Sequence, residues 1–305
     1  MSREIDVCLC TFRRADVVGN CLRAVLGQRL PGGVALGRVI VVDNDASGSA
    51  REAVRSATAG SGAAVVYDIV ATPGIALARN RCLTHVRAER FAFLDDDEVP
   101  EPGWLAALDA ALEAHGADFV QGPVVPRYGP DTPGWVIASG AFERPRPPTG
   151  TPIRVAATNN VLLRTAALDL VPGGFDVGYG QSGGEDTAFF DALSRAGARG
   201  VACDEAVVSE LVEPERMSLG YLMRRSMSSG QNYYNLVLAH AAPGWRWRYA
   251  AKKLGHGLAA LAVAIALAPL GRARQVRWLR EAAKSVGVLR GFLGATRKAA
   301  LYRRP

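Results

Sequence analysis

The run Phe91-Ala92-Phe93-Leu94-Asp95-Asp96-Asp97-Glu98 decides the fold of this chain. Its first half is entirely apolar, as in a strand that is buried on both faces, and its second half is entirely acidic. Strands of this kind belong to parallel sheets that are covered by helices. Ligands of such sheets bind beyond the carboxyl ends of the strands, so the acids lie where a ligand is expected.

Two interpretations of the acidic residues are open at this point. A hard cation with oxygen ligands would relieve the repulsion among neighbouring carboxylates and would bridge phosphate oxygens at the same time. A solvated acidic turn before the helix that follows Pro102 explains the same residues without a ligand. Two more polar strand ends upstream, at residues 11–14 and 43–45, favour the cation site.

The chain around this run alternates between short apolar segments and helical patterns. Strands are predicted at residues 5–10, 38–42, 64–70, 91–94 and 118–124, with helices through about residue 28, over 51–59, after Pro73 and over 104–114. This order predicts an α/β fold, a mostly parallel sheet flanked by helices. Residues 126–152 are expected to be irregular, and a glycine-rich loop at 180–184 precedes a helix that reaches about residue 196.

Composition excludes several classes of protein. The chain is 49% hydrophobic and 21% charged, so it can build a buried core. Its five cysteines form no CxxC pair, which argues against a zinc site or a disulfide framework and fits a reducing cytoplasm. No G-x-G-x-x-G follows the first strand, which argues against a dehydrogenase.

Positive charge is concentrated at the C-terminal end. Residues 244–305 hold 14 Lys and Arg against one acid, Glu281, while the rest of the chain has a net charge of −6 and does not resemble a nucleic-acid-binding protein. The uncharged stretch 257–270 is shorter than the about 20 residues that a transmembrane helix needs. Its flanking cations predict attachment to an anionic membrane surface, and a core-facing helix with a solvated basic face is the alternative.

Five motifs occur in an order that is specific in combination. They are Val-Cys-Leu-Cys-Thr-Phe-Arg-Arg at 7–14, Val-Val-Asp-Asn at 41–44, Gly-Ile-Ala-Leu-Ala-Arg-Asn at 74–80, Phe-Leu-Asp-Asp-Asp at 93–97 and Gly-Glu-Asp at 184–186. With them the chain resembles the family 2 glycosyltransferases, inverting enzymes with the GT-A nucleotide-sugar fold, over about residues 5–225. Within that family it is most similar to bacterial exopolysaccharide glucosyltransferases of the succinoglycan type.

The resemblance implies a domain organisation. A GT-A domain is expected over residues 1–215, with a donor half at about 1–125 and an acceptor half at about 126–215. A helical, basic and apolar extension that associates with the membrane is expected over 216–305.

The resemblance also implies a donor site. Asp43 corresponds to the residue that binds the base, Thr11 and Arg13 to the first nucleotide-contacting turn, and Arg79 to the helix beside the diphosphate. Asp95 and Asp97 correspond to the ends of the DxD motif. Asp97 would ligate Mn²⁺ or Mg²⁺, Asp95 would face the ribose or a metal-bound water, and Asp96 is a further candidate. The expected nucleotide-sugar contacts are thus Thr11, Arg13, Asp43, Arg79, Asp95, Asp96 and Asn160.

Inverting transfer requires a base that deprotonates the acceptor hydroxyl, away from the metal. By resemblance this residue is Asp186, and Glu185 orients the acceptor or shares the role. The alternative is that both are ordinary acids of a first helical turn. No protein nucleophile is needed, because the metal stabilises the leaving diphosphate.

Other positions carry weaker expectations. Asn159 and Asn160 lie where the family lines its sugar and acceptor pocket, with a turn-making Asn pair as the alternative. Arg224 and Arg225 are expected to contact the diphosphate or the acceptor's phosphates, or else to form a solvated helix face. Glu210 stands near the place of a metal-ligating histidine in many relatives, and is either an oxygen ligand or a surface acid.

The expected function is an inverting, metal-dependent transfer of a hexose from a nucleotide-diphosphate sugar to a lipid-linked glycan or other polysaccharide precursor, and the expected donor is UDP-linked. The place expected is the cytoplasmic face of the cell membrane. The Gln-x-x-Arg-Trp motif of processive members is missing, so a single addition is expected. The alternative function is a non-catalytic membrane-associated nucleotide-sugar-binding or assembly protein, against which the pair Glu185-Asp186 argues.

Overall fold

A computed structural model describes residues 3–179, 184–235 and 242–294. Within these ranges the chain forms two compact units, which are described separately. The first unit comprises residues up to 125 and residues 144–210; the second comprises residues 126–143 and the chain from residue 211. The second unit therefore includes residues 126–143 in addition to the predicted helical extension. Of the glycine-rich loop predicted at 180–184, residues 180–183 lie outside the described part.

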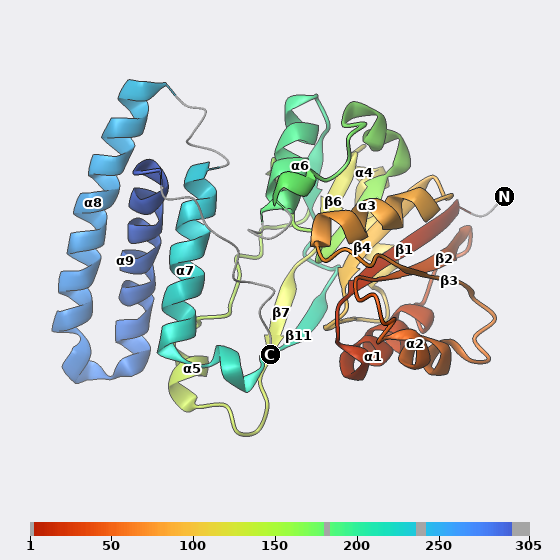
Figure 1. Cartoon of the computed structure of the whole chain (residues 1–305), viewed down its shortest axis with the longest axis horizontal. Coiled ribbons are helices and arrows are strands. Elements are labelled where there is room, and N and C mark those ends of the chain that lie inside the picture. The colour runs from red at the N-terminus through yellow and green to blue at the C-terminus, as the bar shows by residue number, and fades with distance from the viewer. Residues whose placement is uncertain (1–2, 180–183, 236–241, 295–305) are drawn as a thin grey trace. The chain divides into compact units, whose positions relative to one another are not determined.

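The first unit is built on a large sheet, and Figure 1 shows its strands with their flanking helices. From edge to edge the strands are β3 (Ala64–Ile69), β2 (Val34–Asp43), β1 (Arg3–Thr11), β4 (Arg90–Asp95), β9 (Asn160–Arg164), β6 (Phe119–Gln121), β10 (Gly200–Ala202) and β8 (Pro152–Ile153). Neighbours are parallel from β3 to β4 and between β6 and β10, whereas β9 and β8 run antiparallel to their neighbours. The sheet is therefore mixed, with a parallel half that matches the prediction.

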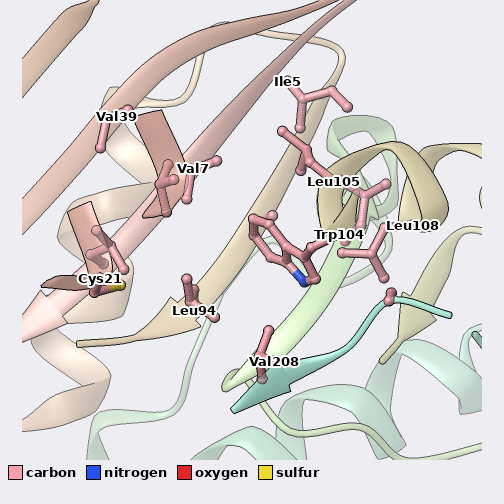
Figure 2. Close-up of a cluster of buried hydrophobic side chains, with 14 of the residues drawn as sticks. Ile5, Val7, Cys21, Val39, Leu94, Trp104, Leu105, Leu108 and Val208 are labelled. Atoms are coloured by element: carbon pink, nitrogen blue, oxygen red, sulfur yellow. The ribbon is translucent and has the colours of Figure 1, made fainter. Parts of the chain in front are cut away.

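Helices cover both faces of this sheet because its strands are apolar on both sides. One face packs against α1 (Ala15–Leu26), α2 (Arg51–Thr58) and α4 (Trp104–Ala114), and the other against α3 (Ile75–His85) and α6 (Glu185–Arg195). Figure 2 shows the first of these cores, in which the ring of Trp104 lies among side chains of the strands and of α4. The short helices η1 (Thr165–Leu170) and η2 (Val177–Tyr179) follow β9.

A smaller sheet has the strand order β5 (Glu98–Pro100), β11 (Val208–Leu211) and β7 (Val124–Arg127). The chain passes from one unit to the other within β7, between residues 143 and 144, and at the end of β11. The segment predicted to be irregular, residues 126–152, contains one short helix, α5 (Gly134–Ala138), because local backbone bonds satisfy this turn.

The second unit is helical. It contains α5, η3 (Pro214–Arg216), α7 (Leu219–Tyr233), α8 (Pro243–Ala266), η5 (Ala268–Leu270) and α9 (Arg272–Phe292), and α9 packs against both α7 and α8 (Figure 1). A small apolar core around Val136, Leu222 and Val276 joins α5, α7 and α9. In the described ranges, none of the helices combines the length and the apolar character that crossing a bilayer requires.

Candidate active site

Three polar strand ends meet at the carboxyl edge of the parallel strands. The register pairs Thr11 at the end of β1 with Asp43 at the end of β2, and Cys10 of β1 with Asp95 at the end of β4. Parallel strands place their carboxyl ends at one edge, so side chains that are far apart in the sequence become neighbours. This confirms the sequence-based expectation that these polar strand ends lie together.

The acidic residues are held by a cation that the sequence did not single out. Arg14 donates from Nη1 to Oδ1 of Asp96 at 3.1 Å and to Oδ2 of Asp97 at 2.7 Å. Asp96 is buried, whereas Asp95 and Asp97 are half-buried. Arg14 is the second of two adjacent arginines in the turn after β1. This Arg-Arg pair was the one feature of the sequence that pointed to a cation beside the acidic run.

Burial and mutual repulsion raise the pKa values of three carboxyl groups in the acidic run. Burial raises the pKa of Asp95 to about 7 against the lowering effect of Arg79, and the charges of Asp97 and Asp96 add to the rise. Burial likewise raises the pKa of Asp96 to about 6, although Arg14 opposes it. The pKa of Glu98, raised first by burial and then by Asp95, lies well above its usual value. Positive charge placed among these carboxylates would favour their ionised forms.

A buried ion pair connects α3 with the start of α6. Nη1 of Arg79 donates to Oε1 of Glu185, and both side chains are more than nine-tenths buried. The guanidinium also lies 5.7 Å from the ring centre of Phe175. Burial lowers the pKa of Arg79, but the negative charges of Glu185, Asp95 and Asp186 outweigh that effect and leave it raised. The predicted donor-side arginine and the predicted catalytic acids therefore share one electrostatic site.

Asp186 differs from its neighbour Glu185 in exposure. It is half-buried in the first turn of α6, and its Oδ1 accepts a hydrogen bond of 2.6 Å from the backbone N–H of Thr187. The preceding residue, Gly184, has a φ of 104°, in the left-handed region that favours glycine. The glycine lets the chain turn sharply into the helix and brings Asp186 to its first turn.

Asp43 and Asn44 shape the loops at the strand ends. Asp43 is 0% exposed, and its carboxylate accepts bonds from the backbone of Asp45 and Ala50 and from the hydroxyl of Tyr67. Asn44 bridges to the loop before α3, since its Oδ1 accepts from Gly74 N–H at 2.7 Å. In this structure Asp43 thus organises its turn, and its contact with the donor base stays a prediction.

Arg13 has an unusual backbone. Its φ of 54° lies in the left-handed region, which costs a non-glycine residue about 1–2 kcal/mol. The side chain is 64% exposed, with Nε 3.4 Å from a carboxylate oxygen of Asp45. This conformation directs the chain from β1 into α1, and the predicted nucleotide contact of Arg13 has the necessary exposure.

The two asparagines after the irregular segment have different surroundings. Asn160 is 0% exposed, its Nδ2 donates to Pro123 and Ala206, and its Oδ1 accepts from the indole of Trp104 at 2.6 Å. Nδ2 thus donates two hydrogen bonds within the protein, and Asn160 stabilises the core. The buried Oδ1 of Asn159 accepts no hydrogen bond from the described residues, which makes Asn159 the better placed of the two for a ligand.

Glu210 is not a solvated surface acid. Its side chain is largely buried and accepts a 3.2 Å bond from Nη2 of Arg144, and its charge raises the pKa values of Asp95 and Glu98. Arg144 lies in the arginine-rich segment before Pro152, but no local pattern in the sequence pointed to this partner.

A divalent cation at this site would need ligands from the substrate as well as from the protein. Within the described ranges, no three His, Cys, Asp or Glu side chains converge closely enough to hold a metal by themselves. Asp95 and Asp97 nevertheless supply hard oxygens, and their mutual charge is unfavourable without a cation. Mg²⁺ is commonly held by one or two carboxylates and by substrate phosphates, and these two residues fit that arrangement.

Arg224 and Arg225 belong to the second unit, on α7. Both are exposed, and Arg225 lines a cavity that Arg224 does not reach. Their predicted contacts with phosphates stay a prediction.

The α/β fold is of the GT-A type. Solved structures support this fold: a mannosyltransferase from Pyrobaculum calidifontis in complex with GDP-Man and Mn²⁺ aligns with a TM-score of 0.66 at 19% identity, covering 95% of this chain and 87% of the other. S. aureus TarS 1–349 in complex with UDP-GlcNAc aligns with a TM-score of 0.56 at 14% identity, over 96% and 92% of the two chains.

The sequence comparisons give the family. Residues 6–170 match the model of glycosyl transferase family 2, and this chain belongs to that family. It is 37% identical over 294 residues to the succinoglycan biosynthesis protein ExoM of Rhizobium meliloti (strain 1021), covering 95% of this chain and 93% of that protein. The chain is thus a glycosyltransferase, and the alternative of a non-catalytic binding protein is not supported.

Proposed function

We propose that this protein transfers a hexose from a nucleotide-diphosphate sugar, UDP-linked, to a lipid-linked glycan or another polysaccharide precursor, with inversion at the anomeric carbon. The observation that carries the proposal is the coupling of Arg79 to Glu185, Asp186 and Asp95. It joins the acidic strand end to a half-buried carboxylate at the start of α6. The succinoglycan role of the relative ExoM supports a polysaccharide precursor as acceptor.

Asp186 is the base in this mechanism. The acceptor hydroxyl attacks the anomeric carbon on the face opposite the diphosphate, its proton passes to the Asp186 carboxylate, and the bond to the diphosphate breaks with its electron pair on the diphosphate oxygen. Glu185 holds the Arg79 guanidinium in place, because its carboxylate is buried against that residue. Arg79 supplies fixed positive charge on the donor side.

A divalent cation, Mn²⁺ or Mg²⁺, would be held by Asp97 and Asp95 and would neutralise charge on the leaving diphosphate. The Mn²⁺ in the complex of the P. calidifontis mannosyltransferase supports the use of a divalent cation. Arg14 binds Asp97 here, so we expect its guanidinium to shift toward Asp96 when the cation and donor bind.

An anionic membrane surface is the proposed partner of α8, and the cytoplasmic face of the membrane is the proposed location of the enzyme. Leu254, Leu258, Leu261 and Ile265 recur every three or four residues on this helix, and all four are exposed. Exposed Arg248 and Lys252 lie on the same helix. An apolar stripe beside cations is typical of a helix that lies in a membrane interface.

The experiment is a screen of nucleotide sugars for thermal stabilisation and for slow hydrolysis, with and without Mn²⁺. The proposal predicts that UDP-sugars stabilise the protein more with Mn²⁺, and that Asp97→Ala removes the metal-dependent part. Asp118→Ala, in the same unit and bonded to the backbone of Arg199, is the control. Equal stabilisation with and without metal, unchanged in Asp97→Ala, would contradict the metal assignment.

A further inference from the structure

The helical unit contains a cavity of about 160 Å³, which is lined by one of the two predicted phosphate contacts of α7, Arg225. It lies among α7, α9 and the residue Ala141. Its polar lining is mostly cationic and hydroxylic: Arg225, Ser226, Ser229, Arg280, Glu281 and Lys284.

Glycines bring the two helices that form this cavity into backbone contact. A Cβ at Gly230 of α7 would lie 2.0 Å from the carbonyl oxygen of Lys284, and one at Gly287 of α9 would lie 1.9 Å from that of Met227. Only glycine permits this approach, which sets the distance between the helices. The cations that precede these glycines, Arg225 on α7 and Lys284 on α9, both line the cavity.

The described lining of the cavity carries a net positive charge, with three cations against one acid. Burial lowers the pKa of Arg280, the charge of Arg225 lowers it further, and Glu281 opposes them. Lys253 of α8 shows the same crowding, since burial and then Lys284 lower its pKa. Glu281 is the one acid among the described lining residues, and its Oε2 also lies 3.5 Å from Nε2 of His256.

We propose that this cavity is a binding site for a terminal phosphate or diphosphate group, held by Arg225, Arg280 and Lys284. Guanidinium and ammonium groups are the usual phosphate ligands, and the hydroxyls of Ser226 and Ser229 can donate to the remaining oxygens. The close approach of α7 and α9 at their glycines brings these cations together. A bound anion would reduce the repulsion among them. The group can come from free pyrophosphate or from a lipid that carries a terminal diphosphate.

The test compares the full-length protein with two double variants that remove equal charge. Arg280→Gln/Lys284→Gln changes the cavity, and Arg29→Gln/Arg154→Gln removes two exposed arginines of the first unit. Inorganic pyrophosphate is titrated by calorimetry at constant ionic strength. The cavity variant should bind at least about tenfold more weakly than the wild type, because it loses two charge-assisted hydrogen bonds to the phosphate oxygens. Arg280→Lys, which keeps the charge, should retain most of the affinity.

A second arm identifies the source of the phosphate. Phosphatidylcholine vesicles containing a polyprenyl diphosphate are compared with vesicles of the same surface charge containing phosphatidylserine. A preference for the diphosphate vesicles that is lost in the cavity variant indicates a lipid ligand, and binding of free pyrophosphate alone indicates a soluble one.

Equal loss in the cavity and control variants, or no loss in either, would overturn the proposal. If the double variant does not fold, the half-buried Lys284→Gln alone gives the same comparison. Stabilisation by nucleotide sugars, a property of the first unit, should be unchanged in the cavity variants, so the two proposals can fail separately.

Discussion

The Arg79–Glu185 pair is the residue-scale feature that most constrains this site. Removing one partner leaves the other charged and buried, which typically costs 3–5 kcal/mol. Glu185→Gln is therefore expected to lower the free energy of unfolding by about 3 kcal/mol or more in urea denaturation. The apolar double replacement Arg79→Met/Glu185→Leu should recover most of that loss while abolishing transfer. A Glu185→Gln protein as stable as the wild type would show that the pair is not formed.

A second residue-scale prediction concerns acid stability at Asp68. Burial raises the pKa of this carboxyl, but His85 and Arg81 lower it more, to about 2 from the ordinary 3.8. Because the folded-state pKa is the lower one, Asp68 stabilises the fold above about pH 4 and loses that contribution as the pH falls toward 2. The difference in unfolding free energy between wild type and Asp68→Asn should shrink over this interval. A difference that is constant with pH would contradict the assignment.

At the same scale, the sequence predicted which residues gather but not how each is used. Asp95, Asp96 and Asp97 were predicted because an apolar strand ends at them, and β4 ends at Asp95. The partners Arg14 and Arg144 were not, since a salt bridge between distant segments depends on tertiary packing. For the same reason the core position of Asn160 could not be seen in its sequence.

At the scale of elements, the contact of α7 with α9 depends on glycine. Gly287→Ala would place a methyl group 1.9 Å from the backbone oxygen of Met227. The two helices would have to move apart to relieve this clash. Overpacking of this kind typically costs 1–3 kcal/mol, and we expect a loss of that size in thermal or urea unfolding.

Gly255→Ala is the matched control for that substitution. Gly255 lies in the exposed face of α8 with no atom within 4 Å of a Cβ, so alanine should be neutral or should stabilise the helix by up to about 1 kcal/mol. Equal effects of the two substitutions would show that the close contact of α7 and α9 is not formed.

The elements themselves were largely predictable. Strands β1 to β4 and their helices follow from apolar runs that alternate with helical patterns, and α4 has the predicted bounds, Trp104–Ala114. The antiparallel insertion of β9 between β4 and β6 was not predicted. Strand order depends on contacts between distant segments, and an apolar run carries no direction.

At the scale of the whole molecule, membrane attachment is predicted to depend on the exposed stripe of α8. Leu258→Ser/Ile265→Ser should weaken binding to phosphatidylserine vesicles at least about tenfold in sedimentation, because a buried Leu or Ile contributes about 1.5–3 kcal/mol. Binding of the wild type should also fall as salt screens the cations.

The control for vesicle binding removes two exposed apolar residues of the first unit. Leu170→Ser/Val177→Ser should bind like the wild type. If both double variants bind as tightly as the wild type, α8 is not the attachment surface.

The central claim is that Asp186 takes the proton of the acceptor hydroxyl while the rest of the site binds the donor. The measurement is the rate of glycosyl transfer together with donor affinity in Asp186→Asn and in Asp191→Asn, which changes a carboxylate of the same helix that pairs with Arg195. Asp186→Asn should lower transfer by about 10²–10⁴-fold with donor affinity nearly unchanged, and Asp191→Asn should change neither. Transfer by Asp186→Asn at the wild-type rate would contradict the account.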